Sequence, residues 1–83
     1  MVPVTGPHWI IHLPTTLTSR DQAIALAGAL RRSLGHVDAL DFGETSVSEE
    51  DAQQLRTRVW CDARVVGAGR CPLPHAHDGP CRA

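Results

Sequence analysis

The chain has 83 residues, with eight arginines, no lysine, nine acidic residues and a formal net charge of −1. This length predicts a single domain, residues 1–83, whose core is too small to hold the fold without a disulfide, a metal ion or a partner subunit. The near-zero net charge gives no general reason to expect a polyanionic partner. No apolar run is long enough to span a membrane.

The first predicted strand covers residues 8–13 (HWIIHL), a short apolar run between two prolines. Its aromatic and β-branched residues are typical of strands. Because side chains alternate along a strand, we expect Trp9, Ile11 and Leu13 to share one face and to pack in the core.

The clearest helix is predicted over residues 20–34. Ser19 is placed to cap it, and Gln22, three positions later, completes a capping-box pattern. Gly35 follows the last periodic residue, so we expect it to end the helix in a left-handed conformation. Apolar residues repeat at helical spacing along one face, at Ala23, Leu26, Ala27, Leu30 and Leu34.

Two further strands are predicted, over residues 37–47 (VDALDFGETSV) and 55–61 (LRTRVWC). Gly43 interrupts the first pattern, whereas the second alternates well. Between them, SEED at residues 48–51 is compatible with a short helical turn capped by Ser48 or with a solvated hairpin connection. The order predicts an α+β fold, in which residues 8–60 place one helix on a three-stranded β-α-β-β sheet and residues 61–81 form a metal-binding module.

Four residues of that module have side chains that bind Zn²⁺ in tetrahedral sites: Cys61, Cys71, His77 and Cys81. The three residues between His77 and Cys81 match the second ligand pair of ordinary zinc fingers. The nine residues between Cys61 and Cys71 exceed the usual ligand spacing, but the GAG sequence at 67–69 lets the backbone turn back. Spacing alone leaves His75 as an alternative to His77.

The three cysteines could instead form a disulfide. The start of the chain, MVPVTGPHW, has neither the basic region nor the apolar stretch of a signal peptide, so we expect a reducing cytoplasm. An odd number of cysteines grouped with histidines is better explained there by metal thiolates than by disulfides.

The run CPLPHAHDGPC resembles the tail of many small actinobacterial and actinophage proteins of unassigned function. In that pattern an upstream Cys-x-Ala precedes Cys-x-Leu-Pro, a His, a Gly and a final His or Cys. The chain differs at Ala76, where the pattern often has Gly, and at Cys81, where it more often has His. The resemblance implies metal binding with His77 as the ligand and His75 as a variable neighbour, and it implies no named activity. The matching residues are Cys61, Ala63, Cys71, Leu73, Pro74, His77, Gly79 and Cys81.

Function follows from the ligand count. Four protein ligands fill a tetrahedral shell, which is typical of structural rather than catalytic zinc. The sequence contains no phosphate-binding glycine loop, dinucleotide fingerprint or nucleophile with its base. We therefore expect a noncatalytic zinc-binding protein.

The predicted sheet leaves one face open to a protein partner or to a second copy in a homodimer. The alternative is single-stranded nucleic-acid binding, in which Trp60 stacks on a base and arginines bind phosphates. Salt-sensitive binding of oligonucleotides would distinguish the two. The open face is predicted to carry His8, Ile10, His12, Arg56, Arg58 and Trp60.

Overall fold

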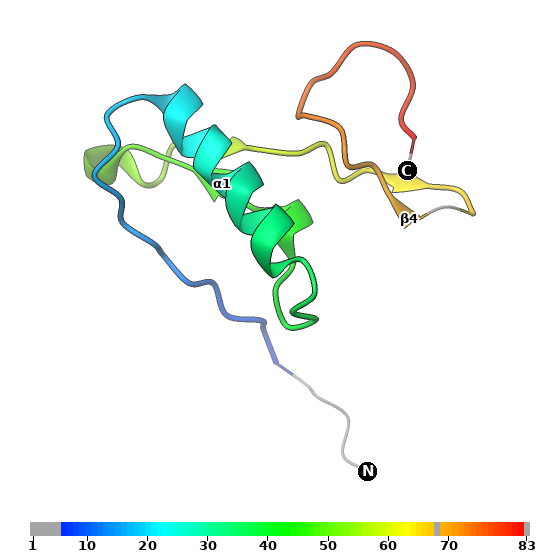
Figure 1. The fold of residues 1–83 in the computed structure, drawn as a ribbon, viewed down its shortest axis with the longest axis horizontal. Helices are drawn as coiled ribbons and strands as arrows, with labels where there is room; N and C mark the ends of the chain where they lie inside the picture. Colours follow the sequence, from blue (N-terminus) through cyan, green and yellow to red (C-terminus); the bar gives the residue numbers. More distant parts are fainter. Residues whose placement is uncertain (1–5, 68, 83) are drawn as a thin grey trace.

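A computed structural model describes residues 6–67 and 69–82 of the chain. The predictions for the first five residues, for Ala68 in the 67–69 turn and for Ala83 lie outside the described residues. Figure 1 shows helix α1 against the strands β1 and β2, with the β3–β4 hairpin and the C-terminal loop to one side of the helix. The elements are α1 (Arg20–Leu34), η1 (Phe42–Glu44), β1 (Ser46–Val47), η2 (Glu50–Ala52), β2 (Thr57–Arg58), β3 (Arg64–Val65) and β4 (Gly69–Arg70).

Helix α1 begins and ends at the predicted residues. Ser19 is extended, and its Oγ accepts a hydrogen bond from the backbone N–H of Gln22 at 3.1 Å. This bond satisfies one of the N–H groups that have no partner within the first turn of a helix. Asp21 in the first turn and Arg31 in the last turn complement the helix dipole. The predicted helix and its serine cap are confirmed.

The prediction that Gly35 ends the helix in a left-handed conformation is wrong. Gly35 has φ −61° and ψ −17°, which is right-handed. The chain leaves α1 through further turns, in which Val37 donates to the carbonyl of Leu34 at 3.0 Å and Leu40 donates to that of Val37 at 3.0 Å. Glycine is needed here for space, because a Cβ would lie 2.7 Å from the carbonyl oxygen of Arg31.

The predicted strand over residues 8–13 is also wrong. These residues form no strand, and Trp9, Ile11 and Leu13 are exposed rather than packed in a core. The physical reason is that a strand needs a neighbour for its backbone N–H and C=O groups. In the described residues β1 and β2 pair with each other alone.

The sheet is smaller than predicted. Strands β1 and β2 are antiparallel, with Ser46 opposite Arg58 and Val47 opposite Thr57. The other described strands, β3 and β4, form a second two-stranded sheet. The α+β class is therefore confirmed, but the three-stranded β-α-β-β sheet is not formed. Around Gly43, in the middle of the predicted strand 37–47, the chain forms the short helical turn η1.

The acidic segment adopts the helical turn η2, one of the two structures that the sequence allowed. Its N-cap is Glu49 rather than Ser48, and no side chain caps it. Strands β1 and β2 are thus joined by a connection that contains this turn.

The core is very small. Its buried apolar residues are Ala27 from α1, Val59 and Cys71, which are 7%, 5% and 1% exposed. In the predicted apolar stripe of α1, Leu26 and Leu34 remain more than a third exposed. None of the described helices has the length and apolar character needed to cross a membrane. So few buried side chains contribute little hydrophobic stabilisation, which increases the need for a further stabilising interaction.

The open sheet face predicted for a partner does not form. His8, Ile10 and His12 belong to the segment that joins no sheet. Trp60 is partly buried, and the guanidinium of Arg31 lies 4.6 Å from the centre of its ring. This cation–π contact joins the last turn of α1 to the segment that leads into the metal-binding module.

Candidate metal centre

A β-hairpin brings Cys61 and Cys71 together. The two sides of the hairpin stay paired beyond the β3–β4 sheet. The backbone N–H of Cys71 donates to the carbonyl of Ala63 at 2.8 Å, and the backbone N–H of Cys61 donates to the carbonyl of Leu73 at 2.9 Å. A further β-bridge follows at Trp60. The nine residues between the two cysteines are therefore folded back on themselves. The long spacing, which is unusual for a zinc knuckle, is explained by this hairpin.

The hairpin is distorted beside Cys61. Asp62 has a positive φ of 54°, and its N–H donates to the carbonyl of Cys71 at 3.0 Å. Aspartate is one of the few residues besides glycine that adopt this left-handed conformation at modest cost. Pro72, on the opposite arm, has no N–H with which to continue the ladder. The regular pairing is interrupted between the two cysteines and resumes at β3.

Two turns bring His77 and Cys81 to the same place. The first is closed by the N–H of His77, which donates to the carbonyl of Pro74 at 3.2 Å, and it contains Ala76 at φ 58°. The second contains Gly79 at φ 79°, a conformation that glycine adopts readily. The C-terminal loop thereby folds back over the hairpin (Figure 1).

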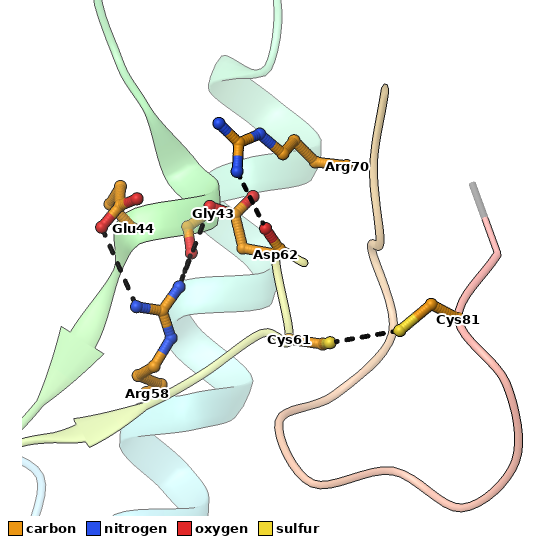
Figure 2. Close-up of polar contacts among 7 residues, drawn as sticks. All are labelled: Gly43, Glu44, Arg58, Cys61, Asp62, Arg70 and Cys81. Carbon is orange, nitrogen blue, oxygen red and sulfur yellow. Dashed lines mark hydrogen bonds and ion pairs between the residues drawn. The ribbon is translucent and has the colours of Figure 1, made fainter. Parts of the chain in front are cut away.

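Three sulfurs and one imidazole nitrogen converge at this point, and we call them the Cys₃His cluster: Cys61, Cys71, His77 and Cys81. Their ligand atoms all lie within 4.8 Å of one another. Figure 2 shows the side chains of Cys61 and Cys81 directed toward each other, with their Sγ atoms 3.6 Å apart. His77 Nε2 lies 3.4 Å from the sulfur of Cys71 and 3.7 Å from that of Cys81.

These distances fit a tetrahedral metal site. With metal–sulfur bonds of about 2.3 Å and metal–nitrogen bonds of about 2.0 Å, tetrahedral angles put two sulfurs about 3.8 Å apart and sulfur and nitrogen about 3.5 Å apart. A disulfide would require a sulfur–sulfur distance of about 2.0 Å. All three cysteines are free thiols. The described residues thus contain a group of side chains that could hold a metal ion.

The structure places His77, and not His75, in the cluster. The Nδ1 atom of His77 lies 3.1 Å from the backbone carbonyl of Asp78. A carbonyl can only accept, so Nδ1 carries the hydrogen and Nε2 keeps its lone pair toward the sulfurs. Metal-binding histidines are commonly oriented by such a bond. The side chain of His75 is exposed and belongs to no candidate metal group among the described residues.

The environment of Cys71 favours its thiolate. Burial by itself would raise the pKa of this thiol. Hydrogen bonds from the backbone N–H groups of Leu73 and Arg82, together with those of the neighbouring thiols, outweigh burial and lower the pKa to about 7. Hydrogen-bond donors around a sulfur stabilise the negative charge of the thiolate, with or without a bound metal ion.

The pKa values of two other members of the cluster, Cys81 and His77, are raised by neighbouring groups. Hydrogen bonds with Cys61 and then with Cys71 raise the pKa of the Cys81 thiol to about 11. The carbonyl of Asp78 is the largest of the influences that raise the pKa of His77. Without a cation, the cluster holds protons that a metal ion would displace.

Arg58 joins strand β2 to η1 and to Asp62, the residue after Cys61, which the sequence pattern did not indicate. Its guanidinium lies 3.4 Å from the carbonyl of Gly43, 3.8 Å from the carboxylate of Asp62 and 3.9 Å from that of Glu44 (Figure 2). A Cβ on Gly43 would overlap the Asp62 carboxylate. Gly43, which interrupts the predicted strand, therefore lets the backbone pass close to Asp62, the residue next to Cys61.

Comparisons of the chain with protein-family models, with curated proteins and with solved structures give no match. The chemistry of the Cys₃His cluster must therefore be judged from its own residues. Three thiols and an imidazole are soft or intermediate ligands, which suit zinc better than magnesium or calcium.

Proposed function

We propose that this protein is a small noncatalytic zinc-binding protein, with one structural Zn²⁺ held by the Cys₃His cluster. The observation that carries the proposal is the convergence of four ligand atoms within 4.8 Å of one another, with three of the pair distances, 3.4, 3.6 and 3.7 Å, near those expected around a tetrahedral ion. The Nδ1–H bond of His77 to the carbonyl of Asp78 adds the outer interaction that orients such a ligand.

A structural role is supported by the ligand count and by the core. Four protein ligands leave no position for a reacting water or substrate. In residues 6–67 and 69–82 the cluster is the single candidate group of this kind. Because Ala27, Val59 and Cys71 are the only buried apolar residues in the described part of the chain, the fold gains more from an ion that ties the hairpin to the C-terminal loop.

We further propose that the protein acts as a protein-interaction module rather than a nucleic-acid-binding one. The three residues that would contact nucleic acid are engaged within the chain. Trp60 has the guanidinium of Arg31 over its ring, and Arg58 faces two carboxylates. Arg56 donates to the backbone carbonyl of Gln53 at 3.2 Å. Free thiols fit a reducing compartment such as the cytoplasm.

Metal analysis of protein purified without added zinc tests the proposal. One zinc per chain is expected, and a chelator should lower the melting temperature sharply because metal binding is coupled to folding. Cys61→Ser should weaken zinc binding, whereas Val66→Ser, at a fully exposed position outside the cluster, should not. A chain that contains no metal, takes up none when zinc is added and melts identically with chelator would refute the proposed function.

A further inference from the structure

The segment before α1 exposes an unusual amount of apolar surface. We call residues 8–13 the arm. Trp9 is 94% exposed, Ile10 66%, Ile11 71% and Leu13 69%. No Asp, Glu, Lys or Arg occurs between residues 6 and 18. Neighbouring apolar residues rarely remain in water without a function, and they commonly mark a site of protein–protein contact.

The same chain contains a groove beside an unpaired strand edge. The groove has a volume of about 360 Å³ and lies between the start of α1, strand β2 and residues 74–76. Its lining is apolar at Ile24, Val59, Pro74 and Ala76 and charged at its rim, at Arg20, Asp21 and Arg58. Strand β2 pairs with β1 on one side, and its other edge has no partner among the described strands as far as Val59, whose carbonyl accepts a hydrogen bond from the backbone N–H of His75 at 3.1 Å. An edge strand of this kind is a template for an added strand.

The arm does not fill this groove in its own chain. Figure 1 shows the arm running from the start of α1 away from the two sheets. Its apolar side chains are mostly exposed along its length, so no described part of the same chain buries them. The arm and the groove are therefore both without a partner within one described chain.

We propose that the arm of one copy docks as an added β-strand beside β2 of a second copy, and that the exchange is reciprocal. A twofold arrangement of this kind uses the same two surfaces on each protomer. The added strand supplies main-chain hydrogen bonds, and alternate side chains enter the groove, as in other complexes formed by strand addition. Trp9 and Ile11 are on one face of such a strand and point into the groove, while Ile10 is on the other face.

A second copy is favoured over an unrelated protein by the surface area and by the lack of charge. A buried tryptophan covers about 150 to 250 Å² and a buried isoleucine or leucine about 60 to 120 Å², so Trp9, Ile11 and Leu13 on the groove face of one arm offer roughly 400 Å². Two arms and the surfaces that they cover would bury roughly 1,600 Å², which is the size of a standard stable interface. An uncharged arm carries none of the residues that keep edge strands from pairing.

The test is the oligomeric state of the zinc-loaded chain of residues 1–83. Sedimentation equilibrium from about 1 to 200 µM should show a monomer–dimer equilibrium. The double variant Trp9→Ser/Ile11→Ser should raise the dimer Kd at least about 100-fold, because large apolar anchors dominate such interfaces. Val66→Ser removes an equally exposed side chain, 98% exposed in the turn after β3, and should leave the Kd unchanged.

Far-UV circular dichroism, measured on each variant, shows whether helix α1 is still formed. Isotope-filtered NMR on a mixed sample should show contacts from Trp9 of one copy to Ile24 and Val59 of the other. A wild-type chain that stays monomeric at 200 µM would overturn the proposal, as would a dimer that the arm variant leaves intact. Contacts from Trp9 to a different surface would also overturn it.

Discussion

Replacement of His77 by alanine decides which histidine holds the metal. In the structure Nε2 of His77 lies 3.4 Å and 3.7 Å from two sulfurs of the Cys₃His cluster, close to the distances expected around one tetrahedral ion. Alanine removes this nitrogen and leaves three thiolates. We expect zinc to remain bound, but more weakly and with water in the vacated position.

The size of the effect follows from the ligand count. Structural zinc binds peptides with about 10 to 16 kcal/mol at neutral pH, so an equal share for one of four ligands is about 2.5 to 4 kcal/mol. A water molecule recovers part of this loss, and a net cost of about 2 to 3 kcal/mol raises the Kd roughly 30- to 150-fold. Competition titration with a chromophoric chelator measures that change directly.

His75→Ala is the matched control. His75 is two residues away and exposed, and its hydrogen bond to Val59 is made by its backbone N–H, which alanine retains. Its zinc Kd should therefore stay within about twofold of the wild-type value. If His75→Ala weakens binding and His77→Ala does not, the assignment of the ligand is wrong. If neither variant changes the Kd, the metal is not bound by an imidazole.

Three other results are expected. Gly43→Ala should lower the free energy of unfolding by about 1 to 3 kcal/mol in denaturant melts, because its Cβ would overlap the Asp62 carboxylate, and the same change should cost less when it is made in an Asp62→Ala background. Ala76→Gly should raise it by about 0.5 to 1 kcal/mol, since Ala76 has φ 58°; an unchanged melt would contradict the left-handed conformation. Zinc affinity should rise at least about tenfold per pH unit above pH 7, because zinc must displace at least the proton of Cys81, whose pKa is raised to about 11. The rise should be steeper below pH 7, where Cys71, with a pKa of about 7, is also protonated, and a chelator titration that gives the same affinity at pH 6 and pH 8 would refute this linkage.

Features encoded by neighbouring residues could be predicted from the sequence. The helix and its Ser19 cap depend on contacts within a few positions, and both bounds of α1 agree with the pattern. The C-terminal ligands are similarly local, since turns around Ala76 and Gly79 bring His77 and Cys81 together. The resemblance to actinobacterial and actinophage proteins also indicated His77, but the family relationship stays a prediction.

Features that depend on distant neighbours could not be predicted in this way. Residues 8–13 have the composition of a strand, but a strand forms only where another offers hydrogen bonds, and that information is absent from the local pattern. Gly35 and Gly43 were interpreted as a helix terminator and a weak point in a strand. Each instead makes room for an approaching atom, from Arg31 and from Asp62 respectively. A glycine in the sequence does not reveal which of these uses applies.

The grouping of all four metal ligands within residues 61–81 has a consequence for the order of folding. Capturing an ion there closes only short loops, and the entropy cost of loop closure grows with loop length. The C-terminal segment can therefore nucleate around zinc before the rest of the chain is arranged. If the cluster binds zinc as proposed, we expect helix α1 to dock afterwards, with Arg31 over the indole of Trp60.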